Sequence, residues 1–245
     1  DLCEIYTDVD GVYTADPNIC DKSRRLDKIS YEEMLEMASL GAKVLQIRSV
    51  EFAARYNVPI LVKSSFIDGG GTLVCKEVSD MEKMEVTGVT YNKNEVKITV
   101  TGVPDKPGIA AHLFGALSDA HIVVDVIVQN VSRDNLADIS FTVAKTDGRK
   151  AFKVMEDAVR ALGKGSVSIN EDIAKVSIVG LGMRSHFGVA SKMFSVLSEE
   201  GINIMAITTS EIKISCVVEK KYGELAVRVP HSTFGLDSEA VTAET

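Results

Sequence analysis

The stretch Ile98–Asn130, ITVTGVPDKPGIAAHLFGALSDAHIVVDVIVQN, is repeated without a gap 80 positions later as Ile178–Ser210, IVGLGMRSHFGVASKMFSVLSEEGINIMAITTS. Identical residues fall where a β-α-β unit needs a strand core residue, a turn glycine or an apolar helix position. The matched pairs include Ile98/Ile178, Gly102/Gly182, Gly108/Gly188, Phe114/Phe194, Leu117/Leu197 and Ile127/Ile207. Two copies indicate a duplicated domain rather than a long array of repeats.

The first copy changes from strand to helix periodicity. Ile98 and Val100 alternate with threonines, which is typical of a half-buried strand. Pro107 and Gly108 then break the strand, and apolar residues at three- and four-residue spacing from Ile109 predict a helix. The run 122–128 is apolar nearly throughout and predicts a buried strand. A strand at 139–144, a helix at 149–162 and a closing strand at 167–169 complete a ferredoxin-like βαββαβ unit.

The second copy follows the same plan with a shorter hairpin. After Ser210 the offset between the copies falls from 80 to 75, so Val131–Asn135 is a loop extension of the first copy alone. The expected elements are a strand at 176–179, a helix at 188–199, strands at 203–208 and 213–218, and a helix from about 222.

The first 80 residues have an α/β pattern. A short strand at 2–6 runs into the acidic turn TDVDG, and ligand sites of α/β sheets lie at such strand ends, although a solvated loop is the alternative. Ser30 and Glu33 predict a capping box for a first helix. A second helix is expected at 42–57, with Lys43 in its opening turn as a surface residue or as a phosphate contact. The segment 78–84 is expected to be a linker.

Composition limits the classes of function. A chain of 245 residues with 45% apolar residues can fold into two or three domains. A net charge of −8 and the lack of a basic stripe oppose a nucleic-acid partner, and no apolar run is long enough for a membrane span. Four widely spaced cysteines predict reduced thiols in a cytoplasmic protein and no metal site. The sequence at Asp1 resembles the middle of a folded domain, so we expect an N-terminal half to be absent.

Several motifs, in order, resemble aspartate kinases. EIYTDVDGVYTADP at 4–17 is similar to the nucleotide-site segment of that family, and GAKVL at 41–45 to a later helix start of the same amino-acid-kinase fold. Five further motifs resemble the tandem ACT domains of the family; they are DKPG at 105–108, VQNVS at 128–132, GMRSH at 182–186, GINI at 201–204 and TSEIKIS at 209–215.

The resemblance implies a fold of mixed α/β and α+β class. We expect the C-terminal part of an amino-acid-kinase catalytic domain at 1–80, one ferredoxin-like ACT domain at 81–170 and a second at 171–245. Pro230 falls where the family usually continues with helix formers, so the final turn of the last helix should be weakened.

The resemblance also implies an activity, which is the phosphorylation of L-aspartate to 4-phospho-L-aspartate by ATP with Mg²⁺. This reaction is the first step toward lysine, threonine and methionine. The family's lysine and glycine-rich phosphate loop would lie before Asp1, so this chain should hold no catalytic residue and be inactive alone. The implied nucleotide-binding residues are Thr7, Asp8, Tyr13, Lys43, Val44 and Asn18, the last standing where the family commonly has arginine.

An amino-acid effector presents a carboxylate and an ammonium group on one carbon. The N–H groups of Gly108, Ile109 and Ala110 at a helix start can hold the carboxylate, and Asp105 can accept from the ammonium while Gln129 closes the far side. The alternative is that Asp105 and Gly108 only shape the turn.

By resemblance, the pocket takes further residues from the other ACT copy of a second chain, with lysine and/or threonine bound across a homodimer interface. Those implied residues are Asn203 and Ile204, with Asp125 and Ser210 close by.

Two other functions remain open on sequence alone. One is a non-catalytic, amino-acid-binding ACT regulatory subunit, in which the first 80 residues are a vestige; such subunits start at an internal methionine, for which Met81 or Met84 would suit. The other is an RNA-binding pair of ferredoxin-like domains, which the acidic net charge opposes.

Overall fold

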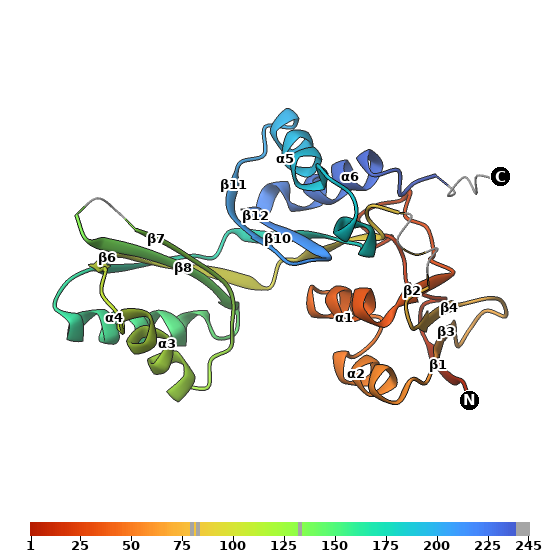
Figure 1. Cartoon of the computed structure of the whole chain (residues 1–245), viewed down its shortest axis with the longest axis horizontal. Coiled ribbons are helices and arrows are strands. Elements are labelled where there is room, and N and C mark those ends of the chain that lie inside the picture. The colour runs from red at the N-terminus through yellow and green to blue at the C-terminus, as the bar shows by residue number, and fades with distance from the viewer. Residues whose placement is uncertain (79–80, 82–83, 132–133, 239–245) are drawn as a thin grey trace. The chain divides into compact units, whose positions relative to one another are not determined.

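The computed structural model describes residues 1–78, 81, 84–131 and 134–238 (Figure 1). Parts of the expected linker 78–84 and of the expected loop extension 131–135 therefore lie outside the described residues. The chain divides into two compact units, which are Asp1–Asn92 with Lys175–Thr245 (unit 1) and Lys93–Ala174 (unit 2). Each unit is described by itself.

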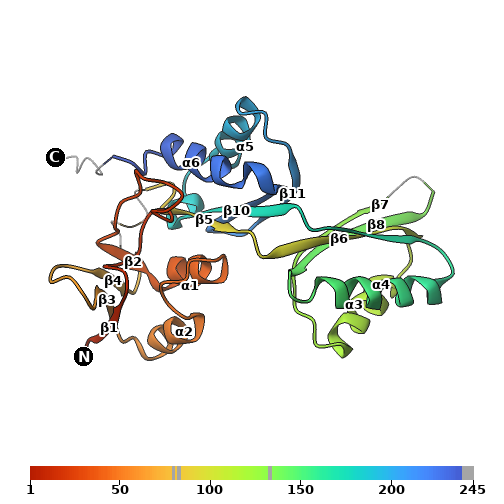
Figure 2. The same cartoon turned by 180° about the vertical axis from the view of Figure 1, so that it is seen from behind.

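Unit 2 is the first sequence repeat, and its βαββαβ fold is as predicted. Its four-stranded antiparallel sheet has the order β7-β8-β6-β9, and both helices cover the same face of the sheet (Figure 2). The elements are β6 (Glu95–Pro104), α3 (Ile109–Asp119), β7 (Val124–Val131), β8 (Leu136–Ala144), α4 (Gly148–Leu162) and β9 (Ser166–Asn170).

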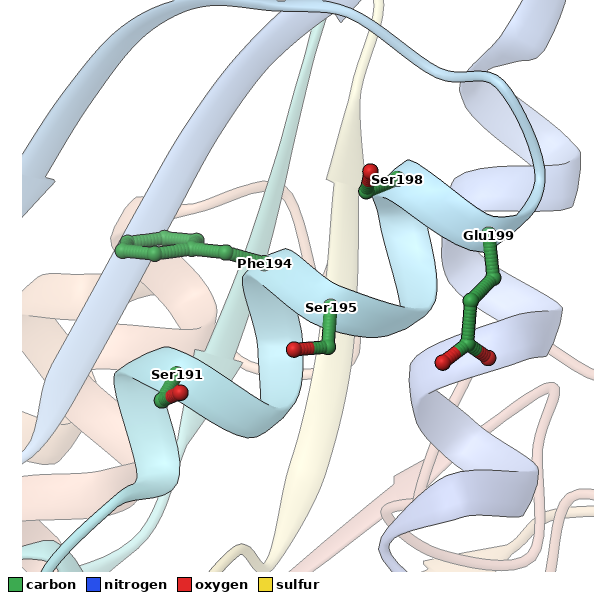
Figure 3. Close-up of a pocket in the computed structure, with 5 residues that line it drawn as sticks. All are labelled: Ser191, Phe194, Ser195, Ser198 and Glu199. Atoms are coloured by element: carbon green, nitrogen blue, oxygen red, sulfur yellow. The ribbon is translucent and has the colours of Figure 1, made fainter.

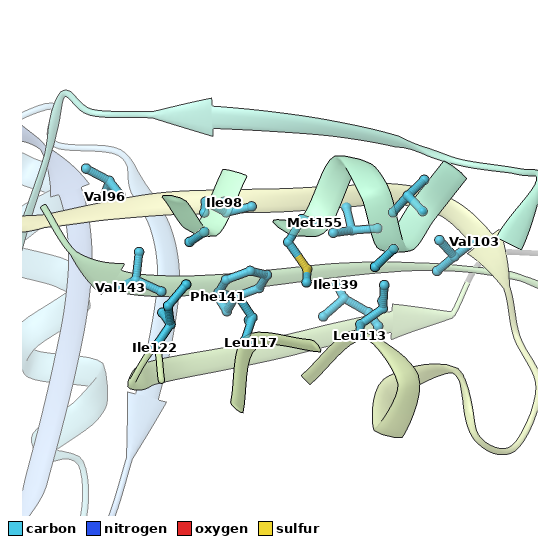
Figure 4. Close-up of a cluster of buried hydrophobic side chains, with 14 of the residues drawn as sticks. Val96, Ile98, Val103, Leu113, Leu117, Ile122, Ile139, Phe141, Val143 and Met155 are labelled. Atoms are coloured by element: carbon cyan, nitrogen blue, oxygen red, sulfur yellow. The ribbon is translucent and has the colours of Figure 1, made fainter. Parts of the chain in front are cut away.

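The core of unit 2 fills the space between this sheet and the two helices. Phe141 of β8 is buried, and its ring meets the edge of Phe114 with 5.5 Å between ring centroids. Leu117 of α3 and Met155 of α4 reach the same cluster from the helices (Figure 4). The apolar residues whose spacing predicted the helices therefore lie on the helix faces that are buried.

The second repeat lies in unit 1 and differs in one strand. Its sheet has the order β11-β12-β10-β5, and β5 pairs antiparallel with β10. The division at residue 81 assigned the strand Gly88–Asn92 (β5) to the first ACT-like domain, but its hydrogen bonds place it in the sheet of the second repeat. The other elements are β10 (Ile173–Val179), η2 (Leu181–Arg184), α5 (Val189–Glu199), β11 (Ile204–Thr209), β12 (Lys213–Glu219), η3 (Lys220–Tyr222) and α6 (Gly223–Thr233).

The rest of unit 1 is a small α/β piece that belongs to the first 80 residues. Its sheet has the order β1-β3-β4-β2, in which β1 and β3 are parallel. Ser30 and Glu33 form the predicted capping box of α1. The elements are β1 (Cys3–Thr7), β2 (Lys28–Ser30), α1 (Tyr31–Ser39), α2 (Ile47–Tyr56), β3 (Ile60–Ser64) and β4 (Thr72–Cys75).

Two sequence predictions about local structure were wrong. The second helix begins at Ile47 rather than 42, because Gly41 takes a φ of 113° against the carbonyl of Tyr91 and the chain then runs as a turn. Helix α6 continues through the buried Pro230, and Phe234 N–H donates to the Pro230 carbonyl at 2.9 Å, so the weakening of its last turn stays a prediction.

The other concerns β7, which was predicted to be buried. Among the described strands it pairs with β8 alone, and Ile127 is 53% exposed, because an edge strand has a neighbour on one side. Among the described residues, the helices are too short or too polar to cross a lipid bilayer.

Candidate functional site

The expected nucleotide segment begins where β1 ends. The Thr7 hydroxyl donates to Asp8 Oδ1 at 3.1 Å, and the Tyr13 hydroxyl donates to Asp10 Oδ1 at 2.9 Å. Arg25 Nη1 forms an ion pair with Asp10 Oδ2 at 3.2 Å. Burial and the hydrogen bond to Asp10 raise the pKa of Tyr13, so its phenol stays neutral. The structure therefore brings Tyr13 together with Asp10 of the acidic turn and with Arg25, neither of which was among the expected nucleotide-binding residues.

The remaining residues expected to bind the nucleotide are Asn18, Lys43 and Val44. Asn18 donates from its backbone and side-chain amides to Asp16 Oδ1 at 2.9 and 3.0 Å, which is an Asx-type turn. Lys43 is exposed in the turn before α2, so it is not in the first turn of a helix. Val44 packs against the core of the α/β piece.

The expected effector turn, Asp105–Gly108, precedes α3 in unit 2. Gly108 has a φ of 95° and is the N-cap of α3, where no side chain caps the helix. Ile109 N–H donates to the Lys106 carbonyl at 3.3 Å, so it is less free for a ligand than predicted, because the turn closes on itself. Within the described ranges, the N–H groups of Gly108 and Ala110 have no partner in a turn or cap.

The other unit 2 residues of the expected site surround this turn in sequence and lie at the surface. Asp105, Asp125 and Gln129 are all exposed, the latter two on β7. The backbone N–H of Asp105 donates to the carbonyl of Asn135 at 2.8 Å. The end of the loop extension therefore contacts the expected effector turn. In the sequence, the only sign of this loop was the fall in offset between the two copies from 80 to 75.

Three expected site residues belong to unit 1. Asn203 is exposed directly before β11, and Ile204 is the first residue of that strand. Ser210 is exposed in the β11–β12 turn, where its N–H donates to the Lys213 carbonyl at 2.8 Å.

Each repeat has a shallow hollow on its outer face that the sequence did not predict. The hollow on α5 has a volume of about 630 Å³ and is lined by Ser191, Phe194, Ser195, Ser198 and Glu199 (Figure 3). The hollow in unit 2 measures about 480 Å³, and Phe114 and Ser118, which line it, are the repeat equivalents of Phe194 and Ser198. The two hollows share this phenylalanine and serine pair, while their other lining residues differ.

Two family models match most of the chain. The model of the ACT domain matches residues 84–163 and 176–234, and the model of the amino acid kinase family matches residues 1–64. An aspartate kinase of Pseudomonas putida is 55% identical over 245 residues, which are 100% of this chain and 60% of that protein. Because the identity to an aspartate kinase runs through the kinase segment as well as the ACT segments, the alternative of a non-catalytic regulatory subunit with a vestigial first 80 residues is not favoured.

Solved structures agree with this assignment. An aspartate kinase from Clostridium acetobutylicum superposes with a TM-score of 0.85 at 26% identity, over 96% of this chain and 54% of that one. Aspartokinase III of E. coli in complex with lysine and aspartate gives a TM-score of 0.75 at 28% identity, over 95% and 52% of the two chains. The chain spans about 60% of the length of the Pseudomonas relative, and it belongs to the aspartate kinase family, with a segment of the amino-acid-kinase domain followed by ACT domains.

Proposed function

We propose that this chain is the C-terminal part of an aspartate kinase that uses ATP and Mg²⁺ to phosphorylate the side-chain carboxylate of L-aspartate. The observation that carries the proposal is the continuous 55% identity to an aspartate kinase through both the kinase segment and the ACT segments. The assignment of residues 81–170 and 171–245 to two ACT domains is part of the proposal, with β5 moved to the second of them.

Several aromatic side chains of the α/β piece are exposed, which fits contact with a further segment. Phe52 and Tyr56 of α2 stack at 6.3 Å and are 59% and 66% exposed, and Phe66 after β3 is 81% exposed. Tyr6 on the edge strand β1 is 54% exposed. In this proposal, the remainder of the kinase domain covers the stacked pair on α2.

The nucleotide segment is suited to the nucleoside end of ATP. The neutral Tyr13 ring offers a stacking surface, and the carboxylate of Asp8 can accept hydrogen bonds from ribose hydroxyls. Among the described residues, no three His, Cys, Asp or Glu side chains converge to hold a metal ion. Phosphoryl transfer needs positive charge around the γ-phosphate, and in this proposal that charge comes from the part of the kinase that the matched region of the relatives does not include.

The turn before α3 is proposed as the effector site for lysine and/or threonine. The uncapped start of α3 presents the N–H groups of Gly108 and Ala110, and a helix start attracts a carboxylate. Apart from the adjacent backbone, no atom of the described residues lies within 4 Å of where a Cβ of Gly108 would be, so a ligand has room to reach the backbone. The exposed Asp105 carboxylate can then accept from the ammonium group. Lysine is the better supported effector, since the E. coli relative was solved with lysine.

A homodimer is proposed to complete that site. Both edge strands β7 and β11 expose an isoleucine at equivalent repeat positions, Ile127 at 53% and Ile207 at 42%. Apolar edge strands of this kind favour pairing with another chain. A second copy would bring Asn203 and Ile204 to the effector turn, and an effector that binds one dimer geometry better shifts the equilibrium toward it.

We place the protein in the cytoplasm. All four cysteines are free thiols, which is usual in a reducing compartment. Cys216 is fully buried in β12, and burial raises its pKa to about 12, so it stays protonated.

The test joins the part of the P. putida enzyme that this chain does not cover to residue 1 of this chain. We expect the purified chimera to release ADP only when aspartate is present, and lysine or threonine to inhibit it. The 245-residue chain alone is the control and should be inactive. A folded chimera that binds ATP but never transfers phosphate to aspartate would contradict the proposal.

A further inference from the structure

The loop that joins β1 to β2 is held by the second repeat. This loop, residues 12–26, forms a narrow hairpin in which Thr14 N–H donates to the Arg24 carbonyl at 2.8 Å and Leu26 N–H to the Val12 carbonyl at 2.8 Å. It contains Tyr13, one of the proposed nucleotide contacts. At the base of the hairpin, the Thr72 hydroxyl of β4 accepts from Val12 N–H at 2.8 Å and donates to the Leu26 carbonyl at 2.6 Å. The other partners come from the second repeat, which supplies β5, α6 and the turn after α6, all within unit 1.

Thr14 is the centre of these contacts. Its carbonyl accepts from Val89 N–H of β5 at 2.7 Å. Its hydroxyl oxygen accepts from Arg24 N–H at 3.0 Å and lies 2.8 Å from Nε2 of His231 on α6. Thr14 and His231 are both fully buried, at 0% exposure.

Two weaker contacts accompany this pair. Arg24 Nε donates to the Leu236 carbonyl at 3.0 Å, and Arg228 Nη1 to the Ile19 carbonyl at 3.4 Å. Both contacts end on backbone carbonyls of their partners, so they orient the loop but do not depend on the partner's side chain. The Thr14–His231 bond is the side-chain to side-chain link of the set, and a buried hydrogen bond of this kind fixes geometry more strongly than an exposed one.

The imidazole of His231 is built to stay neutral. Nδ1 is buried and has no partner among the described residues, so a second ring proton there would be an unsatisfied donor. Burial lowers the pKa of His231; nearby Asp237 raises it and Arg24 lowers it, but burial is the largest effect. A neutral ring with one bonded nitrogen serves as a fixed support for the Thr14 hydroxyl.

We propose that His231 is a positioning residue for the nucleotide: by holding Thr14, it fixes the adjacent Tyr13 and the loop 12–26 in the geometry that binds ATP. The inference rests on the proposed nucleotide site and goes beyond it, since it makes the last helix of the second ACT-like repeat a structural part of that site. ATP affinity then depends on α6, which is far from β1 in sequence.

The experiment uses the complete kinase that contains this chain, with MgATP as the probe. In His231→Leu, KM for ATP should rise about tenfold, which is the loss expected for one buried hydrogen bond, while kcat and KM for aspartate change less than twofold. His231→Gln keeps a polar atom near the position of Nε2 and should restore most of the ATP affinity. Ser232→Ala, on the exposed neighbour in the same helix, is the matched control and should leave KM unchanged.

Two further variants separate positioning from general stability. Thr14→Val should raise KM for ATP as much as His231→Leu, and the double variant should add little, because both remove the same bond. Thr14→Ser keeps the hydroxyl and should behave as wild type. Hydrogen exchange should quicken in residues 12–26 of His231→Leu but not in β3.

The outcomes distinguish this inference from the proposed function. A wild-type protein that binds no ATP refutes both. A wild type that binds ATP, with His231→Leu and Thr14→Val binding it equally well, refutes the positioning role alone. Equal losses in kcat and in both KM values for His231→Leu, without rescue by glutamine, would identify a merely structural histidine and also overturn the inference.

Discussion

The two repeats share a fold, but one strand of each sheet comes from a different place in the sequence: after the repeat in one sheet and before it in the other. In unit 2, β9 follows α4 and pairs antiparallel with β6. In the second repeat, the equivalent place beside β10 is taken by β5, which precedes the whole first repeat. The same position in a sheet can thus be filled from either side, since an antiparallel edge needs only a strand of matching direction.

The turns that precede the first helix of each repeat differ in their contacts. Both helices begin at a glycine with a positive φ and without a side-chain cap, which is Gly108 for α3 and Gly188 for α5. The turn before α3 is open to solvent at the exposed Asp105. The turn before α5 is tied to the α/β piece, because Arg184 forms ion pairs with Glu32 and Glu77, and Leu181 N–H donates to Glu33 Oε1 at 3.0 Å. The second turn is therefore an attachment point for the α/β piece.

Removing Glu33 should break that attachment with the largest effect. Its buried carboxylate accepts from Ser30, from the Thr87 hydroxyl at 2.6 Å and from Leu181 N–H, so Glu33→Ala leaves several buried donors unsatisfied. We expect a loss of about 3 kcal/mol in the free energy of unfolding of unit 1. Urea unfolding followed by NMR should show unit 2 unchanged, and a loss shared by both units would contradict the division. Glu32→Ala is the control, with a loss under about 1 kcal/mol.

Asp105→Ala tests whether the open turn is the one that reads an effector. Loss of the charged acceptor should weaken lysine binding by tenfold or more and abolish the rise in melting temperature that lysine produces. Ser185 occupies the equivalent place in the second repeat, so Ser185→Ala should leave the shift intact. If both variants respond to lysine like the wild type, Asp105 is not part of the site.

Lowering the pH should reduce the stability of unit 1 by a smaller amount. The folded pKa of His231 lies below its ordinary value of 6.5, so the unfolded chain binds the proton more readily. The contribution of His231 is therefore complete above pH 6.5 and is lost as the pH falls from there toward the lowered pKa. Urea midpoints for unit 1 measured from pH 7.5 to 5 should decrease, and His231→Gln should flatten the curve. An identical slope in the variant would remove His231 as the cause.

Arg184→Ala should have the smallest effect. The guanidinium is 31% exposed and two of its carboxylate partners are more exposed still, so water already screens these pairs. We expect less than about 1 kcal/mol of destabilisation in a thermal melt. A larger loss would mean that this cluster, rather than Glu33, is the main attachment.

Patterns within one element predicted much of this fold. The capping box of Ser30 and Glu33, the helix starts after Gly108 and Gly188, and the order of strands within each repeat all follow from residues a few positions apart. Such signals act before any tertiary contact forms, so a single sequence contains them.

The missed features depend on contacts between distant residues. The partner of β5 lies beyond the whole first repeat, and Thr14 and His231 are 217 positions apart. The burial of a strand depends on its place in the sheet, which its apolar sequence does not show. Ile127 was therefore wrongly predicted to be inside. For the candidate site, the sequence indicated the turn Asp105–Gly108 but not that Ile109 N–H is used within it or that Asn135 holds it.

The register of β5 and β10 also has an evolutionary consequence. Asn92 and Lys175, the residues where the chain leaves and re-enters unit 1, are directly paired neighbours on those two strands. A two-residue turn such as Asn-Gly can join antiparallel neighbours of this kind. Residues 93–172 lie between the end of β5 and the start of β10, so recombination can remove or exchange them without cutting either strand. A lineage can therefore change its first repeat while the kinase segment keeps its fold.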